Sequence, residues 1–231
     1  MALDEALLES VSTTPSVAVF RTYGWTVPTL SLGYFQKHAE AETDPLLSDT
    51  SLVRRPTGGG AIWHHRELTY ALVVPRENRL TRCPVDLYRA VHGVISALVR
   101  TQGCSAERRG STSGQSQGNR PFFCFCDRDP EDIVVQGAKI VGSAQRRRDG
   151  AVLQHGSLLL AHSDAMRELP GLSDLAAVPA SPLFWSARMC ESIPSGLAFD
   201  VRADEPARHE LNRASILEQS VYRNSAWTRR R

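Results

Sequence analysis

The chain has 231 residues, of which 42% are hydrophobic and 23% are charged. This is the composition of an ordinary globular protein, and it excludes a largely disordered chain. The 27 basic and 25 acidic residues leave a net charge of +2, which is too balanced to favour nucleic acid or a membrane surface as a partner. The length fits a single domain that spans residues 1–231.

Five cysteines are scattered along the chain without the regular spacing of a disulfide framework. Cys124 and Cys126 lie close together, but no second close pair of Cys or His accompanies them, so we expect no metal site. No apolar run reaches the roughly 20 residues that cross a bilayer. These features predict a cytoplasmic protein in a reducing setting.

The first part of the chain predicts one helix and two strands. Residues 1–11 place apolar side chains at helical spacing on one side. Residues 16–23 and 29–34 are rich in β-branched and aromatic residues, as strands are. The stretch 24–28 between them contains Gly and Pro and indicates a turn, so we expect these two strands to pair.

The middle of the chain predicts two strands, a helix and a loop. Short strands are expected at residues 52–55 and 68–74, each stopped by a proline. Residues 86–102 carry apolar residues on one face and are followed by Gly103, which predicts a helix with a C-terminal stop. Residues 105–120 are polar and rich in Ser, Gly, Gln and Arg, and we expect a mobile loop there.

The last part predicts three more strands and a helix. The strands are expected at residues 133–136, 139–145 and 151–160, with an Asp-Gly pair as the hairpin signal between the last two. A closing helix is expected at residues 206–222. Strands outnumber helices and are joined mostly by turns. This pattern indicates an α+β fold with a mixed, largely antiparallel sheet flanked by helices.

A glycine-rich segment with two arginines lies between two predicted strands. Arg54 and Arg55 precede three successive glycines, Gly58, Gly59 and Gly60. Such glycines let the backbone approach a ligand and point its N–H groups at an anion or a carbonyl. A bare triple glycine is more often a flexible loop, but the two arginines and the histidine that follows make a binding loop an equal alternative.

Two further polar residues lie in apolar, strand-like surroundings. Lys139 is flanked by small residues, among them Gly142, and small neighbours leave room for a ligand chain to pass. Most lysines nevertheless lie on solvated surfaces. His155 lies in an apolar strand, where a histidine is more often a hydrogen-bonded core residue than a catalyst. Both interpretations stay open from the residues alone.

Cys124 lies between phenylalanines and precedes an acidic stretch at residues 127–132. A cysteine in such surroundings is most often buried and inert, because nearby carboxylates disfavour a thiolate. A nucleophilic role requires a cation close to the thiol in space, and Lys139 is the candidate.

Several segments, taken together and in order, resemble the lipoate-protein ligase A family within the wider biotin and lipoate ligase fold, in detail its octanoyltransferase branch. The matching segments are residues 1–8, 28–36, 54–64, 137–145 and 153–157. The resemblance implies an α+β catalytic domain of the biotin/lipoate protein ligase type.

The resemblance also implies roles for individual residues. Cys124 with Phe125 stands 13 positions before Gly137, the spacing of the catalytic cysteine in the transferase branch. Lys139 matches a family lysine that contacts the reacting carbonyl. The implied substrate-binding residues are Arg54, Arg55, Gly58, Gly59, Gly60, His64, Gly142 and His155. An apolar tunnel for the acyl chain would have Gly33, the Gly58–Gly60 loop and the strand around Gly142 as its walls.

The function implied by the resemblance is an octanoyltransferase. It would move an octanoyl group from acyl-carrier protein, through a Cys124 acyl-enzyme and without a cofactor, to a lysine of a lipoyl-type carrier domain. That carrier would be the glycine cleavage H protein or a dehydrogenase E2 subunit, and we expect the enzyme to be a monomer. Two alternatives stay open: a ligase that uses ATP and magnesium through an acyl-adenylate, and a noncatalytic acyl-binding homologue.

Overall fold

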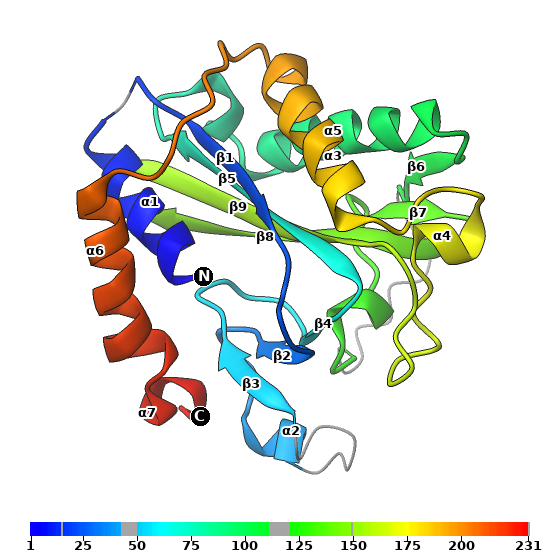
Figure 1. Cartoon of the computed structure of the whole chain (residues 1–231), viewed down its shortest axis with the longest axis horizontal. Coiled ribbons are helices and arrows are strands. Elements are labelled where there is room, and N and C mark those ends of the chain that lie inside the picture. Colours follow the sequence, from blue (N-terminus) through cyan, green and yellow to red (C-terminus); the bar gives the residue numbers. More distant parts are fainter. Residues whose placement is uncertain (15, 43–49, 111–120, 149, 231) are drawn as a thin grey trace.

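The computed structural model describes residues 1–14, 16–42, 50–110, 121–148 and 150–230. They form a six-stranded sheet and a three-stranded sheet, flanked by helices (Figure 1). All neighbouring strands of the larger sheet pair antiparallel, whereas the smaller sheet has one parallel and one antiparallel pair. The expected α+β fold with a largely antiparallel sheet is confirmed.

The larger sheet has the order β1-β5-β9-β8-β7-β6 and the smaller one the order β3-β2-β4. The bounds of the strands are β1 (Val19–Tyr23), β2 (Thr29–Leu32), β3 (Ser51–Arg54), β4 (Ile62–His64), β5 (Glu67–Pro75), β6 (Ala106–Arg108), β7 (Ile133–Val135), β8 (Ala138–Arg148) and β9 (Ala151–Leu159). Every residue of β5 and β9 is buried, which requires cover on both faces of the sheet.

Helices supply that cover. Their bounds are α1 (Ala2–Ser12), α2 (Ala39–Glu42), α3 (Pro84–Thr101), α4 (Leu172–Leu175), α5 (Pro182–Gly196), α6 (Arg208–Leu217) and α7 (Ser225–Thr228). Tighter or wider helical turns are present at Arg79–Thr81, Cys124–Cys126 and Glu218–Tyr222. No helix within the described ranges is both long and apolar enough to span a membrane.

The sequence of α3 sets the bounds of that helix. Pro84 lies in the first turn, where a backbone N–H would have no acceptor within the helix, so the missing N–H of proline costs no hydrogen bond. Gly103 beyond the last turn has a φ of 86°, as a helix C-terminus often requires. Leu87, Val91 and Ile95 recur every four residues along the buried face. The expected helix is confirmed, and it begins two residues earlier than expected.

The core lies on the two faces of the larger sheet. On one face, Leu72 and Ile140 are buried in a cluster that includes Trp185 of α5 and the apolar face of α3. On the other face, Val73 packs in a second cluster with Leu8 of α1. Because neighbouring residues of β5 alternate between the clusters, the sheet is the middle layer between α3 and α5 on one side and α1 on the other (Figure 1).

The expected pairing of residues 16–23 with residues 29–34 is wrong. β1 pairs with β5 in the larger sheet, whereas β2 pairs with both β3 and β4 in the smaller one. All four residues of β2 are buried, and β2 has a neighbouring strand on each edge, while the half-buried β1 lies at a sheet edge. Residues 24–28 therefore cross from one sheet to the other.

The expected loop at residues 105–120 is wrong at its beginning. Ala106–Arg108 form β6, which pairs with β7, and Ala106 is buried against the core beneath α3. A single buried alanine among polar residues is too weak a signal for a strand from sequence alone. Residues 111–120, on which most of the expected loop falls, lie outside the described residues.

The three strands expected in the second half are confirmed as β7, β8 and β9. Gly150 has a φ of 82° in the β8–β9 connection, as an Asp-Gly turn requires, although residue 149 itself lies outside the described residues. The closing helix is confirmed as α6, which ends at Leu217 and continues as a wider turn. β4 and α5 have no counterpart among the expected elements.

Candidate active site

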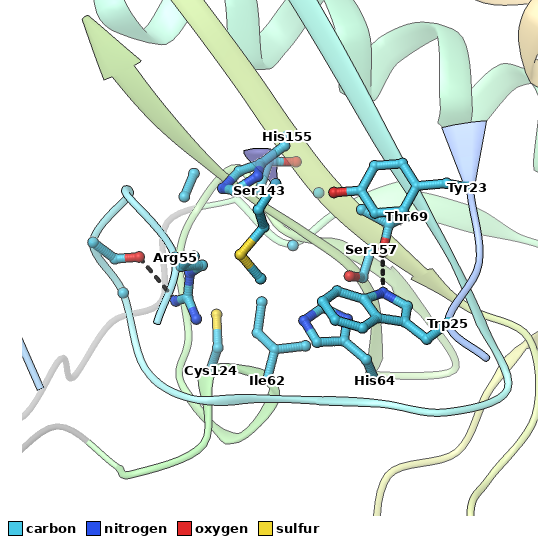
Figure 2. A pocket seen from close by; sticks show the side chains of 16 residues that line it. Tyr23, Trp25, Arg55, Ile62, His64, Thr69, Cys124, Ser143, His155 and Ser157 are labelled. Carbon is cyan, nitrogen blue, oxygen red and sulfur yellow. Dashed lines mark hydrogen bonds between the residues drawn. The ribbon is translucent and has the colours of Figure 1, made fainter. Parts of the chain in front are cut away.

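A cavity with an empty volume of about 450 Å³ lies where the two sheets meet. This volume includes space that opens to solvent. Figure 2 shows Cys124 and Arg55 on one side of the cavity and Trp25, His64 and Thr69 on the other. The larger sheet contributes further lining residues from β8 and β9, namely Gly142, Ser143, Ala144, His155, Gly156 and Ser157.

The two arginines at the end of β3 have different surroundings. The Arg54 guanidinium is fully buried away from the cavity and donates to the carbonyl oxygens of Gly33, Gln36 and Thr228 at 2.7, 2.8 and 3.1 Å. The Arg55 guanidinium lines the cavity. Successive residues of an extended chain point to opposite sides, so only one of the two can reach the cavity.

Arg55 holds the glycine-rich loop in place. Its Nη1 donates to Ser31 O at 2.9 Å, and its Nη2 donates to the carbonyl oxygens of Gly58 and Gly60 at 2.9 and 2.6 Å. Burial lowers the pKa of Arg55 to about 10, so the guanidinium is still protonated at neutral pH. Among the described residues, its buried Nε has no hydrogen-bond acceptor.

The glycines of this loop allow close backbone contacts. Gly59 has a φ of 91°, in the left-handed region that favours glycine. A Cβ on Gly60 would lie 2.8 Å from both Cys124 N and Phe122 O, so only glycine fits there without a shift of the backbone. Gly60 therefore lies behind the cavity wall and lets the Cys124 segment approach the loop.

Cys124 begins the helical turn Cys124–Cys126, which is attached to the smaller sheet. Phe123 pairs with Ala61, and the Cys124 N–H donates to Ala61 O at 2.8 Å. The thiol is half-buried, and Figure 2 shows it pointing into the cavity. Because its backbone N–H is already bonded to Ala61, that group cannot serve a ligand at the same time.

Lys139 lies behind Cys124, outside the cavity lining. Its Nζ is 3.8 Å from Cys124 Sγ, 2.9 Å from Cys124 O and 2.9 Å from Asp132 Oδ1. The lysine side chain is only 3% exposed, and this burial opposes the charged form. The interactions with the Cys124 sulfur and the Asp132 carboxylate outweigh burial, so the pKa of Lys139 is raised and the ammonium persists.

A chain of hydrogen bonds forms the wall opposite Cys124. Trp25 Nε1 donates to Thr69 Oγ1, and Thr69 donates to Glu67 Oε1. The same Glu67 oxygen lies 3.2 Å from His64 Nδ1, and His64 Nε2 lies 2.8 Å from Ser31 Oγ. Burial lowers the pKa of His64 against the opposing effect of Glu67, and the Trp25 ring stacks on the imidazole at 4.1 Å.

Polar groups of the larger sheet also pair with polar groups beside them. His155 Nε2 bonds Thr57 Oγ1 at 2.6 Å, and burial lowers the pKa of His155 to about 3, so the ring is neutral. Ser143 Oγ lies 2.5 Å from Tyr70 OH and 2.6 Å from His92 Nε2. Because these groups satisfy one another, the surface that faces the cavity is almost entirely apolar.

The cavity residues fall within the part of the chain that a known family covers. The family of the Lipoyl protein ligase A/B catalytic domain matches residues 1–170. The chain belongs to this family. The match includes both sheets and every cavity residue, and it ends before α4, α5, α6 and α7.

Individual members of the lipoyl ligase family agree with this assignment. The octanoyltransferase LipM of Symbiobacterium thermophilum is 38% identical over 165 residues, and that of Geobacillus kaustophilus is 39% identical over 168 residues. Each alignment covers 69% of this chain, and the chain spans about 60% of the length of these curated relatives.

The fold also agrees with that of solved members. A crystal structure of lipoate-protein ligase A bound with ATP matches with a TM-score of 0.78 and 24% sequence identity, over 99% of this chain and 92% of that one. At this identity the likeness concerns the fold. The expected biotin/lipoate ligase type of fold is confirmed.

The residues expected at the site from the family resemblance divide into two groups. Those on the cavity surface are Arg55, Gly58, Gly59, His64, Cys124, Gly142 and His155. Those outside its lining are Gly33, Arg54, Gly60 and Lys139. Gly33, Gly60 and Lys139 lie directly against a cavity residue, whereas Arg54 bonds Gly33 O. Their expected roles stay predictions.

Other cavity residues were not expected from the sequence. Trp25 lies in the stretch expected to be a simple turn, and Ser143 lies in a matching segment without having been singled out. A tryptophan beside a turn gives no signal of its own, but Ser143 could have been found, because it follows Gly142 directly. Among the described residues, no group of three or more His, Cys, Asp or Glu side chains could hold a metal ion.

Proposed function

We propose that the chain is an octanoyltransferase that works through a Cys124 acyl-enzyme, with acyl-carrier protein as donor and a lipoyl-type carrier domain as acceptor. The observation that carries the proposal is the Cys124 thiol on an apolar cavity, with the ammonium of Lys139 3.8 Å from its sulfur. A cation at that distance favours a thiolate, which is the nucleophilic form of cysteine. The names of the LipM relatives support the same reaction.

Lys139 and Arg55 would stabilise two different negative charges, the thiolate and the oxyanion. Lys139 lies behind the sulfur, bonded to Cys124 O, where it stabilises the thiolate but does not face the cavity. Arg55 faces the cavity, and its Nε has no acceptor among the described residues. A charged donor beside the nucleophile suits the oxyanion that forms when a thioester carbonyl is attacked. This assigns the oxyanion to Arg55, in place of the carbonyl contact expected for Lys139.

The transfer would take place in two balanced steps. The Cys124 thiolate attacks the thioester carbon of the donor, and the tetrahedral intermediate expels the carrier thiolate, which takes up the proton that Cys124 gave up. The neutral amine of the acceptor lysine then attacks the acyl-enzyme. The C–S bond breaks, an amide forms, and the amine proton returns to the Cys124 sulfur. Neither ATP nor a metal is needed, because an amide is more stable than a thioester.

The cavity would hold the acyl tail by its apolar surface. At about 0.8 kcal/mol per buried methylene, an octanoyl tail would gain roughly 5 kcal/mol. Ile62 and the ring of Trp25 offer carbon surface, and Gly142 and Gly156 line the cavity along β8 and β9.

All five cysteines are free thiols, which accords with a reducing cytoplasm as the setting.

A ligase that uses ATP is the competing hypothesis, because the free Arg55 donor would also suit a phosphate oxygen of an acyl-adenylate. In that reaction Cys124 would be dispensable and magnesium would be required. The two hypotheses therefore differ in whether a covalent intermediate forms on Cys124.

The decisive experiment is intact-mass analysis after incubation with octanoyl acyl-carrier protein in the absence of ATP. We expect one octanoyl adduct on the wild type and none on Cys124→Ala. Cys126→Ala is the matched control, because Cys126 is an exposed cysteine in the same turn, and this variant should acquire the adduct. If no variant is acylated but ATP, magnesium and octanoate modify a lipoyl domain, the transferase proposal is wrong.

A further inference from the structure

Asp132 is linked to the Cys124 sulfur through the buried ammonium of Lys139. Its Oδ1 lies 2.9 Å from Lys139 Nζ, and the same ammonium lies 3.8 Å from Cys124 Sγ. The side chains of Asp132 and Lys139 are 5% and 3% exposed. The ion pair is therefore shielded from water and salt, unlike a pair on the protein surface.

The backbone fixes the Asp132 carboxylate in one orientation. Oδ2 accepts the N–H of Asp129 at 2.8 Å, and the Asp132 N–H in turn donates to Asp129 O at 3.1 Å. The Arg109 N–H donates to Asp132 O at 2.8 Å, which ties this turn to the segment after β6. A carboxylate held at both ends acts as a fixed acceptor for the lysine.

Gly142 leaves the space through which the lysine reaches both partners. A Cβ at this position would lie 2.7 Å from Lys139 Cε and 3.8 Å from Asp132 Oδ1. The lysine side chain therefore occupies the place where any other residue would have a side chain. Its Nζ consequently lies between the Asp132 carboxylate and the Cys124 turn.

The charges around Lys139 favour a lysine that stays protonated over one that accepts a proton. A lysine buried alone tends to lose its proton, since burial disfavours the charged form. The carboxylate of Asp132 opposes that loss, so Lys139 keeps its proton and its position. A general base would have to be neutral before it accepted a proton, which this arrangement opposes.

We propose that Asp132 is the positioning residue of the site: it holds Lys139 as a permanent cation against Cys124 and thereby sets the reactivity of the thiol. The proposal rests on the proposed function only for its biological purpose, since thiol reactivity can be measured without any acyl substrate. Asp132 does not touch the cavity, so it acts on Cys124 through Lys139, and its Oδ2 also lies 3.9 Å from Arg109 Nε.

The test is the rate of Cys124 alkylation by iodoacetamide, followed by peptide mass as a function of pH. In Asp132→Asn we expect the rate at neutral pH to fall roughly ten- to a hundredfold, as for the loss of a hydrogen bond to a charged group. The pH at which the rate reaches half its plateau should move upward. An unchanged rate, or a downward movement from the mere removal of a negative charge, would contradict the proposal.

Glu131→Gln is the matched control. Glu131 is the neighbouring carboxylate and is also largely buried, but it pairs with Arg89 and Arg108, at 3.0 and 2.8 Å, instead of Lys139. The alkylation rate of Cys124 should stay within about twofold of the wild type in this variant, because the Glu131 carboxylate pairs with Arg89 and Arg108 and not with Lys139. A decrease as large as that in Asp132→Asn would mean that any damage to this segment lowers thiol reactivity, and the proposal would fail.

A double variant keeps the question answerable if Asp132→Asn does not fold. Lys139→Met with Asp132→Asn leaves no lone buried charge, and it is compared with Lys139→Met alone. If Asp132 acts through Lys139, the two proteins alkylate at equal rates. A further decrease in the double variant would show that Asp132 acts by another route. Neither outcome depends on octanoyl transfer, so failure of the proposed function would be recognised separately, in the acyl-enzyme experiment.

Discussion

The two sheets are held together in different ways. The larger sheet is stabilised by apolar layers on both faces, such as the cluster around Ile140 and Trp185. The smaller sheet has strands of three or four residues and a smaller apolar cluster around Leu30 and Leu32. Beside it, Arg54 satisfies backbone carbonyls that no strand partner reaches. Apolar burial stabilises the larger sheet, and buried cations organise the loops of the smaller one.

This difference separates stability from chemistry. Arg55 and the Cys124 segment are attached to the smaller sheet, while Lys139 and the apolar floor of the cavity belong to the larger one. Changes in the core of the larger sheet should lower the free energy of unfolding and leave the chemistry of folded molecules intact. Changes at the loops of the smaller sheet should alter the reaction.

The largest effect is expected at Arg55. Arg55→Lys keeps a charge but removes Nε, and we expect acyl-enzyme formation to slow about a hundred- to a thousandfold, as for the loss of an oxyanion donor. Stopped reactions analysed by intact mass give the rate. Arg54→Lys is the matched control, since Arg54 does not line the cavity. It should mainly lower the urea midpoint, and equal rate losses in both variants would erase the distinction between the two arginines.

The next effect concerns the core of the larger sheet. Ile140 is fully buried, and Ile140→Ala should lower the free energy of unfolding by about 3 kcal/mol because it leaves a cavity. Urea denaturation followed by circular dichroism measures this loss. Acyl-enzyme formation per folded molecule should stay within about twofold of the wild type. A large loss of rate at unchanged stability would show that the core of the larger sheet also takes part in the reaction.

A smaller effect follows from the buried His155. Its pKa of about 3 lies below the ordinary value of 6.5, so on acidification the unfolded chain takes up a proton before the folded one does. The stabilising contribution of neutral His155 is complete above pH 6.5 and is lost as the pH falls towards 3. Between pH 7.5 and 5 this amounts to about 2 kcal/mol.

His155→Gln should remove that part of the pH dependence. Urea midpoints at several pH values, for the wild type and this variant, test the expectation. The exposed His209 supplies the control, because His209→Gln should leave the pH dependence unchanged. Parallel curves for all three proteins would mean that His155 is protonated in the folded state at ordinary pH.

The smallest effect is expected at the C-terminal segment that contacts the smaller sheet. Trp227 Nε1 donates to Arg54 O at 2.9 Å, and Trp227→Phe removes this bond while keeping an aromatic ring. The free energy of unfolding should fall by about 1 kcal/mol, the usual net value of one hydrogen bond. Thermal denaturation of wild type and variant is sufficient to detect it. Equal melting temperatures would indicate that the smaller sheet does not depend on this contact.

The strands and the long helix could be predicted from sequence because their signals are local. The apolar face of α3 and the turn residue Gly150 specify structure through neighbouring residues alone. The failure at β1 and β2 has the opposite cause: both segments have strand composition, but their partners are distant in the chain. A turn-like stretch between two strands does not reveal which sheet each strand joins.

The candidate site could be predicted only in its parts. Cys124 and Lys139 could be nominated from the sequence, but their 3.8 Å separation depends on how the Cys124 turn packs beside β8. The acidic stretch after Cys124 argues against a reactive thiol when only sequence distance is considered. In the structure, Asp132 faces Lys139 rather than the thiol, so its charge supports the cation. Sequence spacing does not show which group the Asp132 carboxylate contacts. Because that group is Lys139, we expect Asp132 to raise the reactivity of Cys124 instead of lowering it.

The contact between Arg54 and the C-terminal segment has a consequence for the order in which the molecule can be completed during synthesis. Arg54 Nε donates to Thr228 O, across 174 positions of the chain, and Arg230 lies over the ring of Tyr34 at 3.8 Å. A chain emerging from the ribosome can form β5, α3 and the β8–β9 hairpin before these residues exist, because domains fold progressively as they are made. Arg54 and Tyr34 gain these contacts only when residues 227–230 have been added, so the end of β3 and the loop after β2 are completed after the larger sheet.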